Sequence, residues 1–507
     1  MLSLVSVICL NNPGLAAIVS LLLLALCLLY SCSYPQKTLA WVNGRRATEL
    51  WYFAAQKRFA SDAKGIIALG LRKWPAFNIV TDNGFQTILG PEYANEIRSH
   101  PDLDLSRAVQ ADYNSHISGF EPFKPDTAVI VYDAVRLKLT QRLESITRPL
   151  SDETAVALRS NWTDNSNWHS VHAKGTMLQI VAQISSKIFL GDRVCRDPEW
   201  LRITIDYTID AFIASHYLRL WPRLFRPLAA RVMTPCRKVR ADYQAAKRII
   251  MPLVKERRAD REAAYRRGKP PKQYLDALEW MEECAKGRSY DPAAAQLGLS
   301  LAAIHTTTDL LIQVLYDLCG QEQVVSALRE EIITVILQEG WQKSALYKLK
   351  LMDSVLKETQ RLKPMGVTSM RRMATNDITL SDGTFLPKGT SLSVSCENHW
   401  NPQIYSDPGT YNPYRFLQLR EEPGKETAAQ LVSPSPDHMG FGFGKQACPG
   451  RFFAANEAKI ALCHILLKYD FRLKEGYTPR NMVYSIALSA DPYAELEVRR
   501  RKEEIVL

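Results

Sequence analysis

One cysteine stands in a glycine-rich turn directly before a helix-forming segment, and this arrangement constrains the chain more than any other feature. The turn reads F-G-F-G-K-Q-A-C-P-G-R from Phe441 to Arg451, with the cysteine at position 448. Apolar residues recur at helical spacing from Arg451 to Lys468, which predicts that Cys448 lies near a helix N-terminus. The positive end of the helix dipole and the nearby N–H groups stabilise a thiolate there. The sequence therefore predicts a thiolate that can bind a metal.

The residues around Cys448 predict a large, flat ligand. Gly444 and Gly450 let the backbone approach such a group closely, and Phe441 offers an aromatic face for packing. A haem with Cys448 as its axial iron ligand fits this pattern. The alternative interpretation is a buried structural cysteine, which is the usual role of a free thiol in a globular chain.

The turn resembles the haem-binding loop of the cytochrome P450 family, whose pattern is F-x-x-G-x-(R/H)-x-C-x-G. Phe441, Gly444, Cys448 and Gly450 match this pattern. Gln446 departs from it, because the family usually has Arg or His there, in contact with a haem propionate. Glutamine donates a hydrogen bond but carries no charge, so we expect propionate binding to depend more on other cations.

The resemblance implies the cytochrome P450 fold, which is mainly helical with a small β region. Helical patterns also dominate the sequence itself, after a helix and a small β element that precede residue 93. The candidate helices are 128–146, 152–160, 175–190, 200–215, 233–266, 291–319, 321–338 and 344–362, and the candidate strands are 378–380, 390–394 and 482–489.

Residues 15–34 form an uncharged stretch of twenty residues, which is long enough to cross a bilayer at about 1.5 Å per residue. We predict an N-terminal lumenal stub and transmembrane anchor, residues 1–34, followed by one catalytic domain, residues 35–507. A cleaved signal peptide is the alternative, but no basic residue precedes Lys37. Positive charge follows the span, so the positive-inside rule places the domain in the cytosol. Together with the resemblance, this predicts a single-pass protein of the endoplasmic reticulum membrane.

The formal net charge of +11 favours an acidic partner or an anionic membrane surface, and we expect no nucleic-acid partner. Lys445, Arg451 and Lys459 are candidates for a basic rim that docks an acidic electron donor. The resemblance implies that this donor is NADPH-cytochrome P450 reductase. The segment 217–227 combines apolar residues with arginines and predicts either a membrane contact or a buried packing loop.

Three consecutive threonines interrupt the apolar helix predicted at 291–319, in the stretch A-A-I-H-T-T-T-D. Their hydroxyls can bond back to carbonyls one turn earlier and open a polar notch. The family pattern is (A/G)-G-x-(D/E)-T-(T/S), which places Thr307 on the oxygen-activating threonine and Ala303 on the first small residue. Thr306 replaces the acid and Ile304 replaces the glycine. The alternative interpretation is that these β-branched side chains only pack in a core helix.

The missing acid matters because, in the family, it helps to deliver protons during oxygen activation. His305 and Asp309 are each two positions from Thr307, so both point away from it on a straight helix. We therefore expect water held by Thr306 and Thr307 to relay protons.

Glu358 and Arg361, in K-E-T-Q-R, face the same side of a predicted helix. The resemblance implies that they join Arg415, in Y-N-P-Y-R-F, in a structural ion network that supports the haem loop. It also implies that Arg372 binds a haem propionate, with the adjacent Arg371 as the competing candidate.

Taken together, the resemblance implies a haem b monooxygenase that uses O2 and electrons from NADPH through a separate reductase. The stretch A-C-P-G-R-F-F-A from Ala447 to Ala454 looks most like fungal members that oxidise terpenoids and meroterpenoids. The predicted pocket segments, 299–303, 366–369 and 486–489, are small or apolar and fit a bulky hydrophobic substrate. A haem-thiolate enzyme that desaturates, dehydrates or rearranges its substrate, and a non-catalytic haem-binding protein, are the alternatives.

Overall fold

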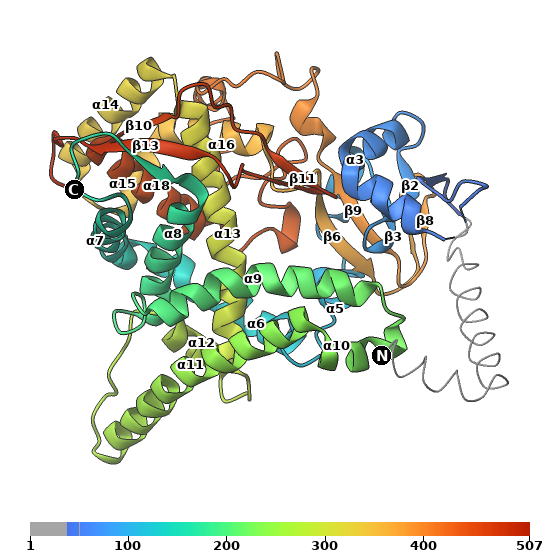
Figure 1. The fold of residues 1–507 in the computed structure, drawn as a ribbon, viewed down its shortest axis with the longest axis horizontal. Coiled ribbons are helices and arrows are strands. Elements are labelled where there is room, and N and C mark those ends of the chain that lie inside the picture. Colours follow the sequence, from blue (N-terminus) through green and yellow to red (C-terminus); the bar gives the residue numbers. More distant parts are fainter. Residues whose placement is uncertain (1–37, 50) are drawn as a thin grey trace, which may run out of the picture.

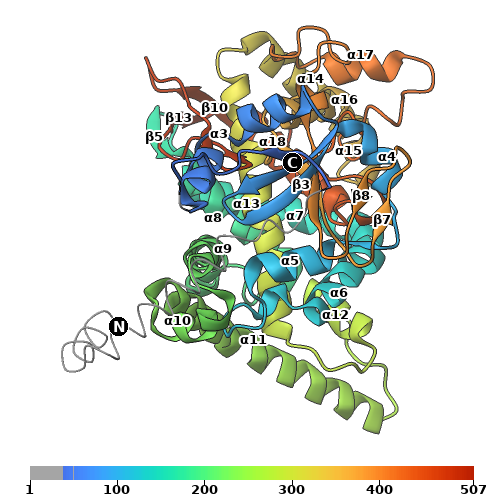
Figure 2. The ribbon, with the colours of Figure 1, turned by 90° about the vertical axis from the view of Figure 1, so that its right-hand side faces the viewer.

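A long apolar helix, α13 (Pro292–Leu318), runs through the middle of the molecule, and the other large helices pack around it (Figures 1 and 2). The computed structural model describes residues 38–49 and 51–507, so the predicted transmembrane helix lies outside the described residues. Asp291 caps α13 by accepting hydrogen bonds from the N–H groups of Ala293 and Ala294. Within the described part of the chain, α13 is the one helix long and apolar enough to span a bilayer, and 61% of its apolar window is buried in the protein. It is therefore a core helix of the fold.

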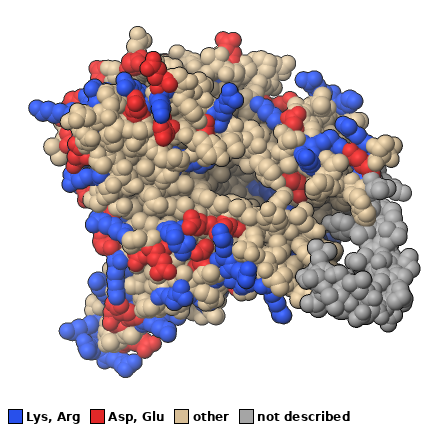
Figure 3. Space-filling model, in the orientation of Figure 1, with Lys and Arg blue, Asp and Glu red and all other residues tan. Residues whose placement is uncertain are grey.

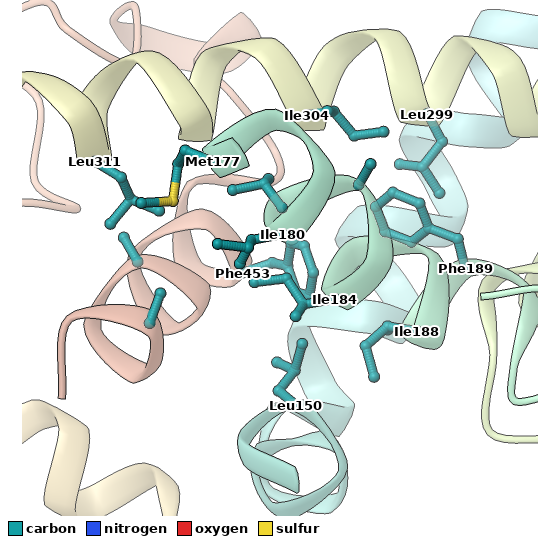
Figure 4. Close-up of a cluster of buried hydrophobic side chains, with 14 of the residues drawn as sticks. Leu150, Met177, Ile180, Ile184, Ile188, Phe189, Leu299, Ile304, Leu311 and Phe453 are labelled. Atoms are coloured by element: carbon teal, nitrogen blue, oxygen red, sulfur yellow. The ribbon is translucent and has the colours of Figure 1, made fainter. Parts of the chain in front are cut away.

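The core forms where α8 (Ala173–Leu190) packs between α13, α7 (Leu143–Trp162) and α18 (Arg451–Lys468) (Figure 4). Buried apolar side chains from all four helices meet there. The remaining helices are α3 (Phe53–Leu71), α4 (Ala94–Ile97), α5 (Leu105–Tyr113), α6 (Pro125–Asp133), α9 (Pro198–Arg219), α10 (Arg226–Val232), α11 (Thr234–Arg266), α12 (Ala277–Ala285), α14 (Glu322–Glu339), α15 (Lys343–Lys348), α16 (Lys350–Leu362) and α17 (Arg415–Glu421).

A six-stranded sheet of order β1-β2-β3-β9-β6-β4 lies to one side of the helical body (Figure 1). Three smaller sheets complete the fold, namely β10-β13-β5 and the pairs β11-β12 and β7-β8. The strands are β1 (Trp41–Val42), β2 (Ala76–Thr81), β3 (Gly84–Leu89), β4 (Leu103–Asp104), β5 (His169–His172), β6 (Thr368–Ala374), β7 (Ile378–Thr379), β8 (Phe385–Leu386), β9 (Ser391–Ser395), β10 (Tyr469–Leu473), β11 (Met482–Tyr484), β12 (Ala487–Ser489) and β13 (Glu495–Arg500).

The mainly helical fold with a small β region is confirmed, but several predicted boundaries are wrong. The predicted helix 344–362 is two helices, α15 and α16, and the predicted strand 482–489 is the antiparallel pair β11-β12. The predicted helices 128–146 and 152–160 also have other bounds. The chain leaves α6 at Asp133, passes through a π-helical segment (Ala134–Leu139) and a short 3-10 turn, and starts α7 at Leu143. Instead of breaking at Pro149, α7 continues through it. Proline removes one backbone hydrogen bond, but the buried side chains of Ile146 and Leu150 hold the helix against the core on both sides of it.

Candidate active site

The cysteine turn is closed by its own backbone. The N–H of Cys448 donates to the carbonyl of Phe441 at 2.8 Å, and α18 begins three residues after the cysteine. Burial raises the pKa of the Cys448 thiol, whereas the backbone N–H groups of Gly450 and Arg451 act in the opposite direction. A metal ion bound to this sulfur would remove its proton outright. The geometry thus provides a partly buried sulfur with two backbone donors that can stabilise its thiolate.

The glycines of this turn have distinct roles. Gly444 has φ +82°, and a Cβ there would lie 2.1 Å from the carbonyl oxygen of Arg98, so the turn can pack against this backbone only with glycine. At Gly450 the nearest atoms to a Cβ would be Val135 Cγ1 at 3.7 Å and Cys448 Sγ at 4.0 Å. A Cβ at position 450 would therefore meet both side chains at ordinary van der Waals distances.

Arg372 brings a buried positive charge that the protein does not neutralise directly. A bulge in β6, with Met370 at φ +52°, turns this part of the strand, and Arg372 is 3% exposed. Its Nη1 donates to the carbonyl of Arg371 at 2.7 Å, but its Nη2 has no partner among the described residues. Burial lowers the pKa of Arg372 to about 10, an effect that Asp104 only partly opposes. A buried guanidinium of this kind fits an anionic ligand such as a haem propionate.

The competing arginine already has a carboxylate partner. Nε and Nη2 of Arg371 donate to the two carboxylate oxygens of Asp112, at 3.2 and 3.0 Å. Of the two arginines, the geometry favours Arg372 for an anionic ligand.

Gln446 is engaged by the protein backbone. Its Oε1 accepts from the N–H of Leu105 at 3.0 Å, and its Nε2 donates to the carbonyl of Leu103 at 2.9 Å. These bonds tie the cysteine turn to β4 and to the first residue of α5. One N–H of the amide is left for a ligand, and its contact with a propionate stays a prediction.

The threonine-rich stretch of α13 contains the expected back-bond. Thr306 Oγ1 donates to the carbonyls of Ala302 and Ala303, at 2.9 and 3.1 Å. Thr307 is buried, and burial raises the pKa of the Glu457 carboxyl on α18, a rise that the side chains of Ser185 and Thr307 only partly oppose. Thr306 and Thr307 thus use their hydroxyls in different ways.

His305 and Asp309 have partners elsewhere. His305 Nε2 lies 3.0 Å from the carbonyl of Ile205 on α9, and Asp309 Oδ1 accepts from the N–H of Ala490 at 2.7 Å. Lys174 approaches the same carboxylate oxygen at 3.5 Å. These contacts agree with the expectation that neither residue simply replaces the missing acid.

Glu358, Arg361 and Arg415 lie together. Arg361 binds both carboxylate oxygens of Glu358 at 2.8 Å, and Arg415 Nε reaches the same oxygens at 3.1 and 3.2 Å. Glu358 and Arg361 are fully buried. Arg361 also donates to the carbonyls of His399 and Pro408, so the cluster connects α16 to the chain that leads toward the cysteine turn.

The predicted basic rim is wrong at one position. Lys459 is 5% exposed and pairs with Asp353 at 2.6 Å, so it cannot contribute to a docking surface. Arg451 is partly buried and donates to the carbonyls of Val432 and Cys448. Of the three candidates, Lys445 alone is exposed.

Two groups near the site were missed from the sequence. The Tyr132 hydroxyl reaches the carbonyl of Lys445 at 3.4 Å, and the Arg136 guanidinium lies 6.0 Å from the centre of the Tyr132 ring. Glu457 is a single acid inside the apolar helix α18, and it is fully buried. A single acid among the apolar residues of this helix was the signal available in the sequence.

The predicted pocket segments before β6 and after β11 lie side by side. Gly366 forms an isolated β-bridge with Ala487, and the N–H of Val367 donates to the carbonyl of Ile486 at 2.8 Å. Figure 3 shows a recess in this face of the molecule, between α9 and the strands β6 and β11, with a rim formed mainly by uncharged residues. A concave site with few charged side chains on its rim suits a hydrophobic small molecule.

Comparison with known proteins places the chain in one family. The family model described as Cytochrome P450 matches residues 129–494. The cytochrome P450 monooxygenase adrA of Penicillium rubens is 50% identical over 496 residues, which cover 96% of this chain and 97% of that protein. The cytochrome P450 monooxygenase pyr3 of Aspergillus fumigatus is 46% identical over 498 residues, covering 97% and 95%.

A solved structure shows a similar fold. Retinoic acid bound cyanobacterial CYP120A1 has a TM-score of 0.63 at 17% sequence identity, and the match covers 88% of this chain and 96% of that one. With the family match and the monooxygenase relatives, the fold and the cysteine turn lead to one conclusion: this chain belongs to the cytochrome P450 family and is a haem-thiolate monooxygenase.

Proposed function

We propose that Cys448 is the axial ligand of haem b in an enzyme that hydroxylates, or successively oxidises, a bulky hydrophobic secondary metabolite. The observation that carries this proposal is the Cys448 turn, which Gln446 ties to β4, the neighbour of the strand β6 that carries the unneutralised Arg372 guanidinium. Phe441, Gly444 and Gly450 would shape the cofactor surface, and Ala303 would leave room above it. When bound, the haem supplies reductive activation of O2, with electrons from NADPH delivered by NADPH-cytochrome P450 reductase.

We assign Thr307 and Thr306 to the oxygen side of this cofactor. The hydrogen bonds from Thr306 to two carbonyls of α13 support a local polar opening in an otherwise apolar helix. Glu358, Arg361 and Arg415 take a structural role, because their charges are satisfied within the protein.

The substrate class that we favour is a terpenoid or meroterpenoid intermediate. The apolar segments that meet at Gly366 and Ala487 support a bulky hydrophobic ligand, and the similar fungal proteins are monooxygenases. The test is a substrate screen on microsomes that contain a reductase, with mass analysis of the products under isotopically labelled dioxygen. Incorporation of one labelled oxygen per oxidation supports hydroxylation. Loss of two hydrogens without incorporation supports desaturation instead, and turnover without NADPH supports rearrangement.

We further propose that residues 1–34 anchor the domain, residues 35–507, in the endoplasmic reticulum membrane, with the domain in the cytosol. A group of exposed apolar side chains near the end of α9 and on α10 supports a second contact with the same membrane, in the region 217–227 and just beyond it. These side chains are Tyr217, Leu220, Leu224, Phe225, Leu228 and Val232. The check is protease treatment of intact microsomes. Digestion of the domain is expected, and protection of the domain would contradict the cytosolic orientation.

A further inference from the structure

The residue that follows the β11-β12 hairpin is held by both of its backbone groups. Ala490 is 0% exposed, and its N–H donates to Asp309 Oδ1 on α13 at 2.7 Å. Its carbonyl accepts from Lys174 Nζ on α8 at 3.1 Å, and the same ammonium lies 3.5 Å from Asp309 Oδ1. The carboxylate, the ammonium and the two backbone groups thus form a closed clamp. Because Ala490 is shielded from water, either backbone group would be left unsatisfied if its partner were removed.

Two more hydrogen bonds attach the same part of the chain to α13. Gln313 Nε2 donates to Asn481 Oδ1 at 3.0 Å, directly before β11, and the Tyr316 hydroxyl donates to the carbonyl of Asp491 at 3.2 Å. Asp309, Gln313 and Tyr316 follow one another at spacings of four and three, so they lie on one face of the helix. Both ends of the hairpin are therefore attached to the helix that carries the threonine-rich stretch.

The hairpin itself has little that would fix its position. Its two strands pair at three positions, and the side chains of β11 are exposed. A lone two-stranded hairpin is only marginally stable in water, so its place depends on what holds its turn and its ends. At the turn, the N–H of Ser485 donates to the carbonyl of Ala60, and the Ser485 hydroxyl donates to Asp82. The clamp and the bonds to α13 hold the ends.

The hairpin borders the site proposed above for the substrate. Its residues Ile486 and Ala487 meet the segment 366–367, which leads into β6. The Tyr484 hydroxyl lies 3.3 Å from Nδ1 of His216, near the end of α9. These contacts place the hairpin at the recess of Figure 3, between β6 and α9.

We propose that Asp309, together with Gln313, is a positioning residue that fixes this hairpin and so determines how well bulky hydrophobic ligands bind. Its carboxylate acts through the backbone of Ala490. When the clamp is released, the apparent affinity for a ligand falls in proportion to the fraction of molecules that keep the hairpin in place. A ligand too small to reach the hairpin does not sense the change. The inference rests on the proposed function, because it takes residues 486–489 as part of the substrate site.

Two imidazoles that bind the haem iron of the ferric holoenzyme are the probes. Imidazole itself is too small to reach the hairpin, whereas clotrimazole carries three aromatic rings and fills a bulky apolar site. Their dissociation constants are read from the shift of the haem absorption band. In Asp309→Leu we expect clotrimazole to bind roughly tenfold more weakly, as for the loss of one buried hydrogen bond to a charged group. Imidazole should bind as it does to the wild type.

Asp309→Asn is the conservative variant, because its amide oxygen still accepts from the N–H of Ala490. Clotrimazole should bind to it nearly as tightly as to the wild type. A loss in Asp309→Asn as large as that in Asp309→Leu would contradict a role through this hydrogen bond.

Asp317→Leu is the matched control. Asp317 lies about two turns further along α13, and its carboxylate binds Thr359 and Lys363 at the end of α16. This variant should lower stability and haem content but keep the wild-type ratio of the two dissociation constants. An unchanged ratio in Asp309→Leu, or an equal change in Asp317→Leu, would overturn the proposal.

Asn481→Ala covers the case in which Asp309→Leu does not fold. Asn481 is exposed, and alanine there removes the bond to Gln313. Clotrimazole should then bind roughly threefold more weakly, with imidazole unchanged, and wild-type affinity for clotrimazole would contradict the proposal.

The same titrations separate this inference from the proposed function. Failure of imidazole to shift the wild-type haem band, or a wild type that does not prefer clotrimazole, counts against the proposed haem site and its bulky apolar cavity. A wild-type preference for clotrimazole that survives in Asp309→Leu counts against the clamp alone.

Discussion

Arg372 is a buried cation that has no direct carboxylate partner among the described residues. Its Nη2 lacks a hydrogen-bond partner and Asp104 acts on it only at a distance, whereas the adjacent Arg371 is bound by both oxygens of Asp112. An unpaired buried cation is expensive to maintain, so an anionic group of a ligand is the natural counter-ion. With Gln446 uncharged and bonded to the backbone, this arginine becomes more important than it would be beside a second cation.

Replacing Arg372 should therefore reduce haem content. A hydrogen bond to a charged group contributes about 1.5–3 kcal/mol, which corresponds to roughly ten- to a hundredfold in haem affinity. The measurement is the haem-to-protein ratio of purified Arg372→Ala. Arg371→Ala is the control, because it breaks a pair with Asp112 and should lower stability while keeping more haem. Equal haem content in Arg372→Ala and the wild type would show that Arg372 does not hold the haem.

The burial of His399 predicts that the stability of the protein depends on pH. His399 lies fully buried beside Arg361, and burial lowers its pKa to about 4. Its Nε2 accepts from the N–H of Met439 at 2.9 Å, and its Nδ1 lies 3.1 Å from the carbonyl of Arg361. Below its usual pKa of about 6.5 the unfolded chain binds a proton that the folded chain excludes. Stability is therefore lost as the pH falls from about 6.5 to about 4.

The check is urea unfolding at a series of pH values. In His399→Asn the free energy of unfolding should start lower but fall less steeply over this range, because the group that must be protonated is gone. His438 and His464, whose pKa values burial also lowers, remain and keep part of the slope. An unchanged slope would show that His399 is not one of the groups responsible.

At the scale of elements, the ion cluster joins α16 to α17 and to the chain that precedes the cysteine turn. Glu358 accepts hydrogen bonds from Arg361, Arg415 and the N–H of Asn412. Its side chain and that of Arg361 are 0% exposed, so neither charge can be hydrated if the other is removed. The cluster fixes geometry rather than adding net stability over an apolar equivalent.

Glu358→Gln should be strongly destabilising, by about 3–5 kcal/mol, because it leaves two buried or half-buried guanidinium groups without a carboxylate. Denaturant unfolding and haem retention measure the loss. Asp152→Asn is the control, because it breaks an ion pair with Arg148 whose side chains are 59% and 60% exposed, and it should cost less than about 1 kcal/mol. A comparable loss in both variants would contradict the structural role of the cluster.

Local patterns in the sequence gave the cysteine turn, the extent of most helices and the Glu358–Arg361 pair, because each depends on residues close together in the chain. The features that could not be predicted from the sequence depend on packing between distant segments of the chain. The amide of Gln446 bonds to Leu103 and Leu105, more than three hundred positions away. The carboxyl of Glu457 accepts its hydrogen bond from Ser185 on α8, which lies 272 positions away in the chain.

At the scale of the whole molecule, α18 links the cysteine turn to the apolar core. It begins directly after the cysteine turn, and Glu457 lies on it about 9 Å further along, at about 1.5 Å per residue from Arg451. The same helix packs with α8 and α13 in the apolar core of Figure 4. The Cys448 turn directly precedes α18 and Glu457 lies on it, so this helix holds the cysteine turn against the apolar core.

The central claim is that Cys448 is the haem ligand, and the carbon monoxide difference spectrum of the reduced protein tests it most directly. The wild type should show the absorption band of a thiolate-ligated haem, and Cys448→Ser should lose it. Cys463→Ser, which changes a buried cysteine on α18, should retain the band. A thiolate-type band that persists in Cys448→Ser would contradict the account.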